Sequence, residues 1–315
     1  MNLPTFADIE KAHERIRPYI HYTPVLSSKS INEIVGAELF FKCENLQKVG
    51  AFKFRGACNS VFSLSDEEAK NGVCTHSSGN HAAALALAAR MRGIPAYIVM
   101  PENAPEIKKI AVAGYGAQIT FCTPTLEARE STLKKVAAET GATEIHPYNY
   151  FNVICGQGTA AKELIEEIGL LDVVMAPVGG GGLLSGTALS AKALLPNALV
   201  IAAEPAGADD AFRSFYSKTL QPSVAPKTIA DGLLTSLGSL TFPIIMNEVD
   251  QIATVSEESI VAAMRMIWER MKIIIEPSSA VALAMVMKHK HRFEGKKIGI
   301  ILSGGNVDLM QLPWM

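Results

Sequence analysis

The chain has 315 residues, of which 49% are hydrophobic, and its 29 basic and 31 acidic residues give a net charge of −2. This length is enough for a large core and for more than one domain. The charge is close to balanced and has no long block of one sign, which argues against a nucleic-acid partner and against an acidic membrane surface. No apolar run is long enough to span a bilayer, so a membrane protein is not expected.

The five cysteines are scattered and never spaced C-x-x-C. An odd, scattered set argues against a disulfide framework and against a thiolate metal site, and it favours a reducing compartment. Asp8 and Glu10 precede any apolar run, which is unlike a secretory signal. We therefore expect a cytoplasmic globular protein.

The first elements along the chain are a helix, a strand and a second helix. Thr5 and Asp8 have the spacing of a capping box, and apolar residues follow at helical intervals. Alternation over residues 37–43 predicts a strand, and residues 52–64 have helical spacing, with Ser65 able to cap the next segment.

From residue 73 onward, predicted strands and helices alternate. Strands are expected at 73–75, 96–100, 117–122, 145–148, 172–177, 198–203 and 297–302. Helices are expected at 80–92, 106–112, 126–139, 157–168, 183–195, 256–271 and 278–288. Such alternation predicts parallel sheets covered by helices. Ligands bind such sheets beyond the carboxyl ends of their strands, so the loops that follow several strands should face one cleft.

Four consecutive glycines, Gly179 to Gly182, lie between a predicted strand and a predicted helix. Uncovered N–H groups at a helix N-terminus favour an anion, most often a phosphate. The G-x-G-x-x-G spacing fails because Leu184 and Ser185 stand where the third glycine would fall, and no Walker lysine follows. The alternative is a tight turn, although four glycines are more than a turn needs.

Lys53 lies between Phe52 and Phe54 near the start of a predicted helix. An apolar pocket would lower the pKa of the lysine and make its amine nucleophilic. The alternative is a lysine that extends its ammonium from the helix surface into water. A phosphate site together with a desolvated lysine suggests pyridoxal phosphate.

Four motifs occur in a distinctive order: residues 50–57, 77–81, 179–183 and 303–308. The chain thereby resembles, over essentially its whole length, the serine/threonine dehydratase and serine racemase family of fold-type-II (tryptophan synthase β-like) pyridoxal phosphate enzymes. The resemblance implies an α/β, two-domain, three-layer parallel-sheet fold. A large cofactor-binding domain would comprise residues 1–70 and 150–315, a small mobile domain would comprise residues 71–149, and the enzyme would be a homodimer.

The resemblance also assigns the cofactor residues. Lys53 would be the Schiff-base lysine and the base on one face of the cofactor. The remaining contacts would come from Phe52, Asn80, Gly179, Gly180, Gly181, Gly182, Leu183, Gly232 and Ser303. Ser303 would face the pyridine nitrogen with a neutral hydroxyl, which makes the cofactor a weaker electron sink than a carboxylate partner would. Elimination of a β-hydroxyl is then favoured over transamination.

Ser78 is the residue that bears on racemisation. Serine racemases of the family carry serine here, whereas dehydratases often carry alanine. Ser78 would be the second acid/base on the face opposite Lys53, or it would only bind the substrate carboxylate, as Ser77, Asn80 and His81 would.

Other substrate contacts are implied by the resemblance with open alternatives. His81 is either a carboxylate contact or a core histidine. Arg129 either reaches the substrate when the small domain closes or forms an ion pair on its helix. Thr235 stands where racemases tend to have serine. Glu276 either supports the cleft or simply begins the next helix. No role is assigned to His13, His21, His76, His146, His289 and His291, which lack metal spacing.

Residues 204–210 resemble the divalent-cation loop of the family. Glu204, the Ala208 carbonyl and Asp210 would form a hard oxygen set for Mg²⁺, Mn²⁺ or Ca²⁺. The alternative is a solvated pair of carboxylates. Serine racemases of the family are often stimulated by Mg·ATP at a dimer interface, for which Lys48 is the weak candidate here. Few residues follow Asp308, so we expect no regulatory domain.

The predicted function is dehydration of L-serine and L-threonine to a 2-oxo acid and ammonia, together with serine racemisation. The alternatives are dehydration of 3-hydroxyaspartate and, further off, β-replacement of the cysteine synthase type. A rival from another class is a noncatalytic protein that binds a nucleotide at the glycine run.

Overall fold

The computed structural model describes residues 2–77, 79–104 and 106–314, apart from the side chain of Ile107. Two sheets organise the chain. The larger has the order β1 (Val25–Leu26), β2 (Glu38–Cys43), β10 (Lys297–Leu302), β7 (Val173–Pro177), β8 (Leu199–Pro205) and β9 (Gln251–Val255). All neighbouring strands in it are parallel except β1, which pairs with β2 in the antiparallel direction.

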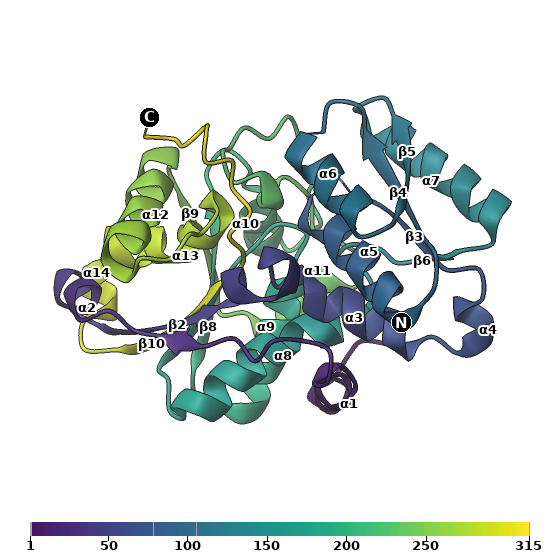
Figure 1. The fold of residues 1–315 in the computed structure, drawn as a ribbon. Helices are drawn as coiled ribbons and strands as arrows, with labels where there is room; N and C mark the ends of the chain where they lie inside the picture. The colour runs from purple at the N-terminus through teal and green to yellow at the C-terminus, as the bar shows by residue number, and fades with distance from the viewer. Residues whose placement is uncertain (1, 78, 105, 315) are drawn as a thin grey trace.

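The smaller sheet has the order β5 (Gln118–Cys122), β4 (Ala96–Pro101), β3 (Val73–His76) and β6 (Thr143–Glu144), and it is parallel throughout. Helices α5 (Asn80–Arg92) and α6 (Glu106–Gly114) cover one side of this sheet, and helix α7 (Leu126–Thr140) covers the other (Figure 1).

Helices also cover both faces of the larger sheet, which gives three layers. One face packs against α8 (Phe151–Ile168), α9 (Gly182–Leu194), α10 (Asp210–Ser217) and α11 (Thr241–Glu248). The other packs against α2 (Lys29–Val35), α12 (Glu257–Met271), α13 (Pro277–Lys288) and α14 (Lys290–Phe293). The predicted α/β class with parallel sheets is confirmed. The two sheets agree with the expected two-domain division, whose boundaries stay a prediction.

Helix α3 (Lys53–Ser63) packs against α8 of the larger half and α5 of the smaller half, so it joins the two. Helix α1 (Phe6–Ile16) lies on α8, and α4 (Asp66–Ala69) follows α3. Short 3₁₀ turns are η1 (Glu44–Leu46), η2 (Lys48–Gly50) and η3 (Asp231–Leu233).

The expected helix starts at Thr5 and Ser65 are confirmed. The Thr5 N–H donates to the Asp8 carboxylate over 3.1 Å, and the Ser65 hydroxyl accepts the Glu68 N–H at 3.3 Å. Each contact satisfies a backbone donor at a helix start, where four N–H groups have no intrahelical acceptor.

The predicted strand at residues 145–148 is wrong. The strand that the structure has in this region is β6, which ends at Glu144. Pro147 has no N–H, and the His146 ring accepts the N–H groups of Tyr148 and Asn149, so this segment turns instead of pairing. The following helix begins at Phe151, six residues before the expected position of 157. Helices and strands that the sequence patterns missed are β1, α2, α10, α11, β9 and α14.

Candidate active site

Several strand ends converge near the first turn of α3. Strand β7 leads into the glycine run, β10 leads into Ser303, β3 leads into Ser77, and β6 leads into His146. Because all four strands are parallel to their neighbours, their carboxyl ends present loops at the same edge of each sheet. Contacts from Lys53 to Pro147 and from Asn80 to Glu276 show that several of these loops meet. The cleft between them stays a prediction.

Lys53 is the first residue of α3, and its side chain is partly buried. Its Nζ donates to the Pro147 carbonyl at 2.8 Å and lies 5.2 Å from the centre of the Phe52 ring. Burial lowers the pKa of the Lys53 amine to about 8, against the opposing influence of the nearby Glu276 carboxylate. An amine with a lowered pKa is a better nucleophile and base at neutral pH than an exposed lysine.

The glycine run begins α9 and has no room for side chains. Gly181, the residue before the helix, has φ +86°. A Cβ at Gly180 would lie 2.4 Å from the Tyr148 ring, and a Cβ at Gly179 would lie 2.9 Å from Leu233 Cα. The first N–H groups of α9 have no intrahelical acceptor, and no described side chain caps the helix start. Such a helix start suits a phosphate group.

Ser303 follows β10 and is 2% exposed. Its hydroxyl lies 3.1 Å from the Ser279 hydroxyl, which also bonds the backbone of Gly304. The Ser303 carbonyl accepts the Phe52 N–H at 2.9 Å, which ties this loop to the start of α3. Gly232 donates its N–H to Ser278 at 3.2 Å, which brings η3 to the same wall.

Asn80 belongs to a chain of polar contacts across the cleft. Its Nδ2 donates to both oxygens of Glu276 at 3.2 and 3.1 Å, and its Oδ1 accepts from Asn306 Nδ2 at 2.9 Å. Glu276 is 3% exposed, and burial, together with the nearby Asp231 carboxylate, raises its pKa to about 7. Glu276 therefore both precedes α13 as its N-cap residue and supports the cleft.

These residues fit pyridoxal phosphate. A lysine with a lowered pKa, a glycine-rich helix start without a side-chain cap and a buried neutral hydroxyl are groups that the cofactor requires. The model of the family described as pyridoxal-phosphate dependent enzyme matches residues 16–304. The chain belongs to this family.

The similarity between this pyridoxal-phosphate dependent enzyme and its relatives covers nearly the whole chain. It is 54% identical to the beta-hydroxyaspartate dehydratase of Paracoccus denitrificans, over 100% of both chains. It is 55% identical to the serine racemase of Dictyostelium discoideum, over 98% of this chain and 96% of the relative. The structure of maize serine racemase matches with a TM-score of 0.96 at 49% identity, covering 98% of this chain and 95% of that chain.

The residues predicted to bind the substrate differ in how far they are buried. Ser77 is partly exposed, and its hydroxyl accepts the Gly79 N–H at 3.3 Å. His81 is 2% exposed, and its Nε2 contacts the Ile145 carbonyl at 3.2 Å. Burial, reinforced by Lys53, lowers the pKa of His81, so its ring is neutral. Ser78 lies outside the described residues, and its catalytic role stays a prediction.

Arg129 and Thr235 belong to different halves of the enzyme: Arg129 lies in the smaller half, and Thr235 follows η3 in the larger half. Arg129 is in the first turn of α7, where its Nε donates to the Thr125 carbonyl at 3.3 Å. No ion pair of Arg129 occurs within the described part of the chain, so the alternative of a helix-surface pair finds no support there. Thr235 is exposed. Burial raises the pKa of Tyr148, and the Thr235 hydroxyl opposes this rise.

Sequence patterns missed an aromatic cluster beside Lys53. The His146 ring stands edge-on to both the His76 and Tyr148 rings, with centroids 6.2 and 4.6 Å apart. His76 ends β3 and His146 follows β6. The signal that could have identified them is their position immediately at the carboxyl ends of two strands.

An ion pair joins the two halves of the enzyme at the cleft. Lys108 of α6 donates to the Asp231 carboxylate of η3. Their side chains are 24% and 50% exposed, and both charges are near enough to influence the pKa of Glu276. Sequence could not predict a contact between residues 123 positions apart.

The proposed cation loop contains an unpartnered charge. Asp210 is 0% exposed, and neither of its carboxylate oxygens has a hydrogen-bond partner among the described residues. Burial raises its pKa to about 6, and the nearby Ser223 hydroxyl opposes this rise although it is not within hydrogen-bond geometry. Glu204 accepts the N–H groups of Ala211 and Phe212 at 3.0 and 2.8 Å, and burial raises its pKa to about 8. Buried carboxylates of this kind suit a hard cation.

A buried ionic network anchors the start of α3. Arg55 bonds Glu44 through two nitrogens at 2.7 and 2.9 Å and bonds Glu163 through two contacts of 2.7 Å. Lys42 is 2.7 Å from Glu163, and the Thr23 hydroxyl donates to Glu44 at 2.6 Å. The four charged side chains are fully buried.

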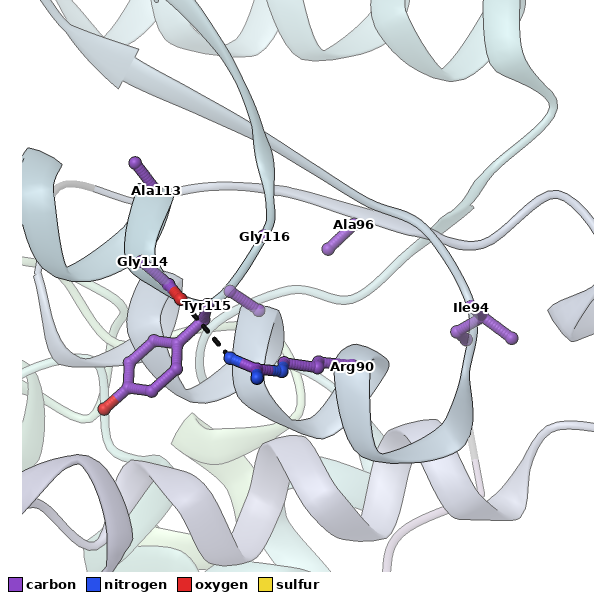
Figure 2. A pocket seen from close by; sticks show the side chains of 8 residues that line it. Arg90, Ile94, Ala96, Ala113, Gly114, Tyr115 and Gly116 are labelled. Atoms are coloured by element: carbon purple, nitrogen blue, oxygen red, sulfur yellow. Dashed lines mark hydrogen bonds between the residues drawn. The ribbon is translucent and has the colours of Figure 1, made fainter.

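A separate hollow of about 340 Å³ lies in the smaller half between α5 and the end of α6 (Figure 2). Arg90 donates to the Gly114 carbonyl at 3.4 Å beside Tyr115. The lining contains none of the residues that converge on Lys53, so this hollow is distinct from the active site.

No helix in the described ranges is long and apolar enough to cross a membrane.

Proposed function

We propose that this enzyme removes the β-hydroxyl of small β-hydroxy amino acids, giving a 2-oxo acid and ammonia, and that it also racemises serine. The observation that carries the proposal is Lys53, whose amine has a pKa lowered to about 8 and donates to the Pro147 carbonyl. Tyr148, the residue after Pro147, lies against Gly180 of the glycine run. Relatives named serine racemase and hydroxyaspartate dehydratase support the substrate class.

The residues of this chain divide the work. Bound pyridoxal phosphate withdraws electrons from the α-carbon of the substrate. Lys53 takes the α-proton, and the neutral hydroxyl of Ser303 keeps the electron demand moderate, which favours loss of the β-hydroxyl over transamination. Ser77 and Asn80, at the end of β3, would receive the substrate carboxylate. Ser78 would return a proton from the opposite face during racemisation.

Rates on matched substrates test the proposal. The ratio kcat/KM is measured for L-serine, L-threonine and each stereoisomer of 3-hydroxyaspartate, with 2-oxo acid and D-serine quantified separately. Lys53→Ala should abolish both products. Ser78→Ala should lose D-serine formation and keep 2-oxo acid formation. If Lys53→Ala retains either activity, or if the purified enzyme forms neither product, the proposal is wrong.

3-Hydroxyaspartate is the second candidate substrate. The 54% identical relative from Paracoccus denitrificans has this activity in its name. Arg129 is a cation close enough to His76 to lower the pKa of that ring, although burial is the larger cause. A second substrate carboxylate could pair with this arginine. A kcat/KM for 3-hydroxyaspartate above that for L-serine would make it the principal substrate.

The proposal extends to the surroundings of the site. Asp210, Glu204 and the Ala208 carbonyl would hold Mg²⁺, Mn²⁺ or Ca²⁺, which the unpartnered Asp210 carboxylate supports. The five cysteines are free and buried, which suits a cytoplasmic location. The homodimer and activation by ATP rest on the family resemblance alone.

A further inference from the structure

His146 is held in one orientation at the edge of the active site. It follows β6, and its Nδ1 accepts the N–H of Tyr148 at 3.3 Å and the N–H of Asn149 at 3.0 Å. A ring nitrogen that accepts two N–H groups carries no proton, so the neutral ring has its proton on Nε2. The orientation and the tautomer of His146 are therefore both set by its own loop.

The ring stays neutral at physiological pH. Burial, together with the nearby His76 and Lys53 side chains, lowers the pKa of His146 to about 4. Nε2–H is then a hydrogen-bond donor and not a source of protons for catalysis. No acceptor for it lies among the described residues, a set that leaves out Ser78.

The His146 ring lies close enough to the Lys53 amine for that amine to lower the pKa of the ring. The carbonyl of the next residue, Pro147, accepts the Lys53 Nζ–H at 2.8 Å. Lys53 must reach the α-hydrogen of the substrate, so groups that flank the Lys53 amine face the substituents of the α-carbon. A neutral donor suits an uncharged hydroxyl oxygen, whereas a carboxylate favours a charged partner.

We propose that His146 Nε2–H donates a hydrogen bond to the β-oxygen of the substrate and thereby positions the hydroxyl for departure. This inference rests on the proposed function and adds a residue that selects the leaving group. The α C–H bond breaks, its proton passes to Lys53, and its electron pair forms the double bond between the α- and β-carbons. The β C–O bond breaks, and the oxygen takes a proton from Lys53 and leaves as water. His146 positions the oxygen and exchanges no proton.

Two substitutions separate the positioning role from the structural one. His146→Asn keeps an oxygen that can accept the N–H groups of Tyr148 and Asn149, as an asparagine side chain does in a turn, but it has no donor at the Nε2 position. His146→Gln keeps a donor near the Nε2 position and loses the acceptor. The two variants therefore remove one function each.

The assay compares L-serine with β-chloro-L-alanine, since both give pyruvate and ammonia but chloride leaves without a proton. His146→Asn should lower kcat/KM for L-serine about tenfold, which is about 1.4 kcal/mol, and change the value for β-chloro-L-alanine by no more than about twofold. Serine racemisation, which breaks no C–O bond, should persist. His146→Gln should retain more of the preference for L-serine than His146→Asn.

An equal fall for both substrates in His146→Asn, or no fall for either, would overturn the proposal. Failure of the proposed function is a different result, because the wild-type enzyme would then form no pyruvate from L-serine. The melting temperature of each variant is measured alongside. A His146→Asn variant that is as stable as the wild type but leaves the ratio of the two substrates unchanged also contradicts the inference.

Discussion

Arg55→Met tests the buried network that anchors α3, two residues after Lys53. The network contains two cations and two carboxylates, Arg55 and Lys42 with Glu44 and Glu163. Removing Arg55 leaves one cation for two carboxylates. Glu163 keeps Lys42 at 2.7 Å, but Glu44 keeps only the Thr23 hydroxyl among its described side-chain partners.

The cost follows from this imbalance. Breaking a buried ion pair by removing one partner destabilises a protein by about 3–5 kcal/mol, because an uncompensated charge remains buried. We expect Arg55→Met to lose about this much of its free energy of unfolding. Adding Glu44→Gln to Arg55→Met leaves one cation and one carboxylate, so we expect the double variant to regain about half of the loss.

Urea unfolding of the cofactor-free proteins, followed by the fluorescence of Trp268 and Trp314, measures these free energies. The deficit should also depend on pH. In Arg55→Met a buried carboxylate lacks its cation, so protonation should stabilise the folded state. The folded variant then binds more protons, so its deficit shrinks as the pH falls toward the unfolded pKa of about 4.3.

The wild type should respond in the opposite direction. Burial raises the pKa of Glu163, but its hydrogen bonds and charge pairing with Arg55 outweigh burial, and the net pKa is lowered. Stability from Glu163 is therefore present above its unfolded pKa and lost as the pH falls through the folded pKa. A loss below about 1 kcal/mol in Arg55→Met, or a deficit independent of pH, would refute the reasoning.

Four further predictions concern the active site and its support. In the cofactor-free enzyme, labelling of Lys53 by an amine reagent should rise with a midpoint near pH 8, because burial lowers its pKa, whereas exposed lysines titrate near pH 10.4. Gly180→Ala should cost about 1–3 kcal/mol of stability, since its Cβ would lie 2.4 Å from the Tyr148 ring, and Tyr148→Ala should relieve part of that cost. Mg²⁺ should raise the melting temperature of the wild type but not that of Asp210→Asn. Lys108→Met should change stability by only about 0–1 kcal/mol but raise KM for L-serine, because the partly exposed ion pair joins the two halves of the enzyme. Lys108→Arg should behave like the wild type.

Each of these predictions has a clear contrary result. A labelling midpoint above pH 10 would show that Lys53 is solvated. Additive costs in the Gly180 and Tyr148 double variant would mean that the two residues do not clash. A Mg²⁺ response that survives in Asp210→Asn would place the cation elsewhere. An unchanged KM in Lys108→Met would separate the ion pair from substrate binding.

The sequence predicted those parts of the fold and site that have strong local signals. The glycine run and the buried strands before Gly179 and Ser303 lie within short windows, and the structure has β7 and β10 where the pattern placed them. Lys53 could be identified as unusual because its two phenylalanine neighbours are adjacent in the chain.

The remainder depends on contacts between distant residues. Lys53 meets Pro147 across 94 positions, and Asn80 meets Glu276 across 196 positions. The predicted strand at 145–148 failed because the His146 side chain, and not a neighbouring strand, accepts the backbone N–H groups there. No periodicity contains such information. For the same reason the six histidines without metal spacing had no assigned role, although His146 lies at the cleft.

The central claim is that Lys53 binds pyridoxal phosphate and acts on the substrate, and peptide mapping after borohydride reduction tests it most directly. The enzyme is incubated with pyridoxal phosphate, reduced, digested and analysed by mass spectrometry, with Lys53→Ala as the control. The account predicts one equivalent of cofactor on the peptide that contains Lys53, loss of 2-oxo acid formation after reduction, and no adduct in the control. An adduct on another lysine, or full activity without any adduct, would contradict the account.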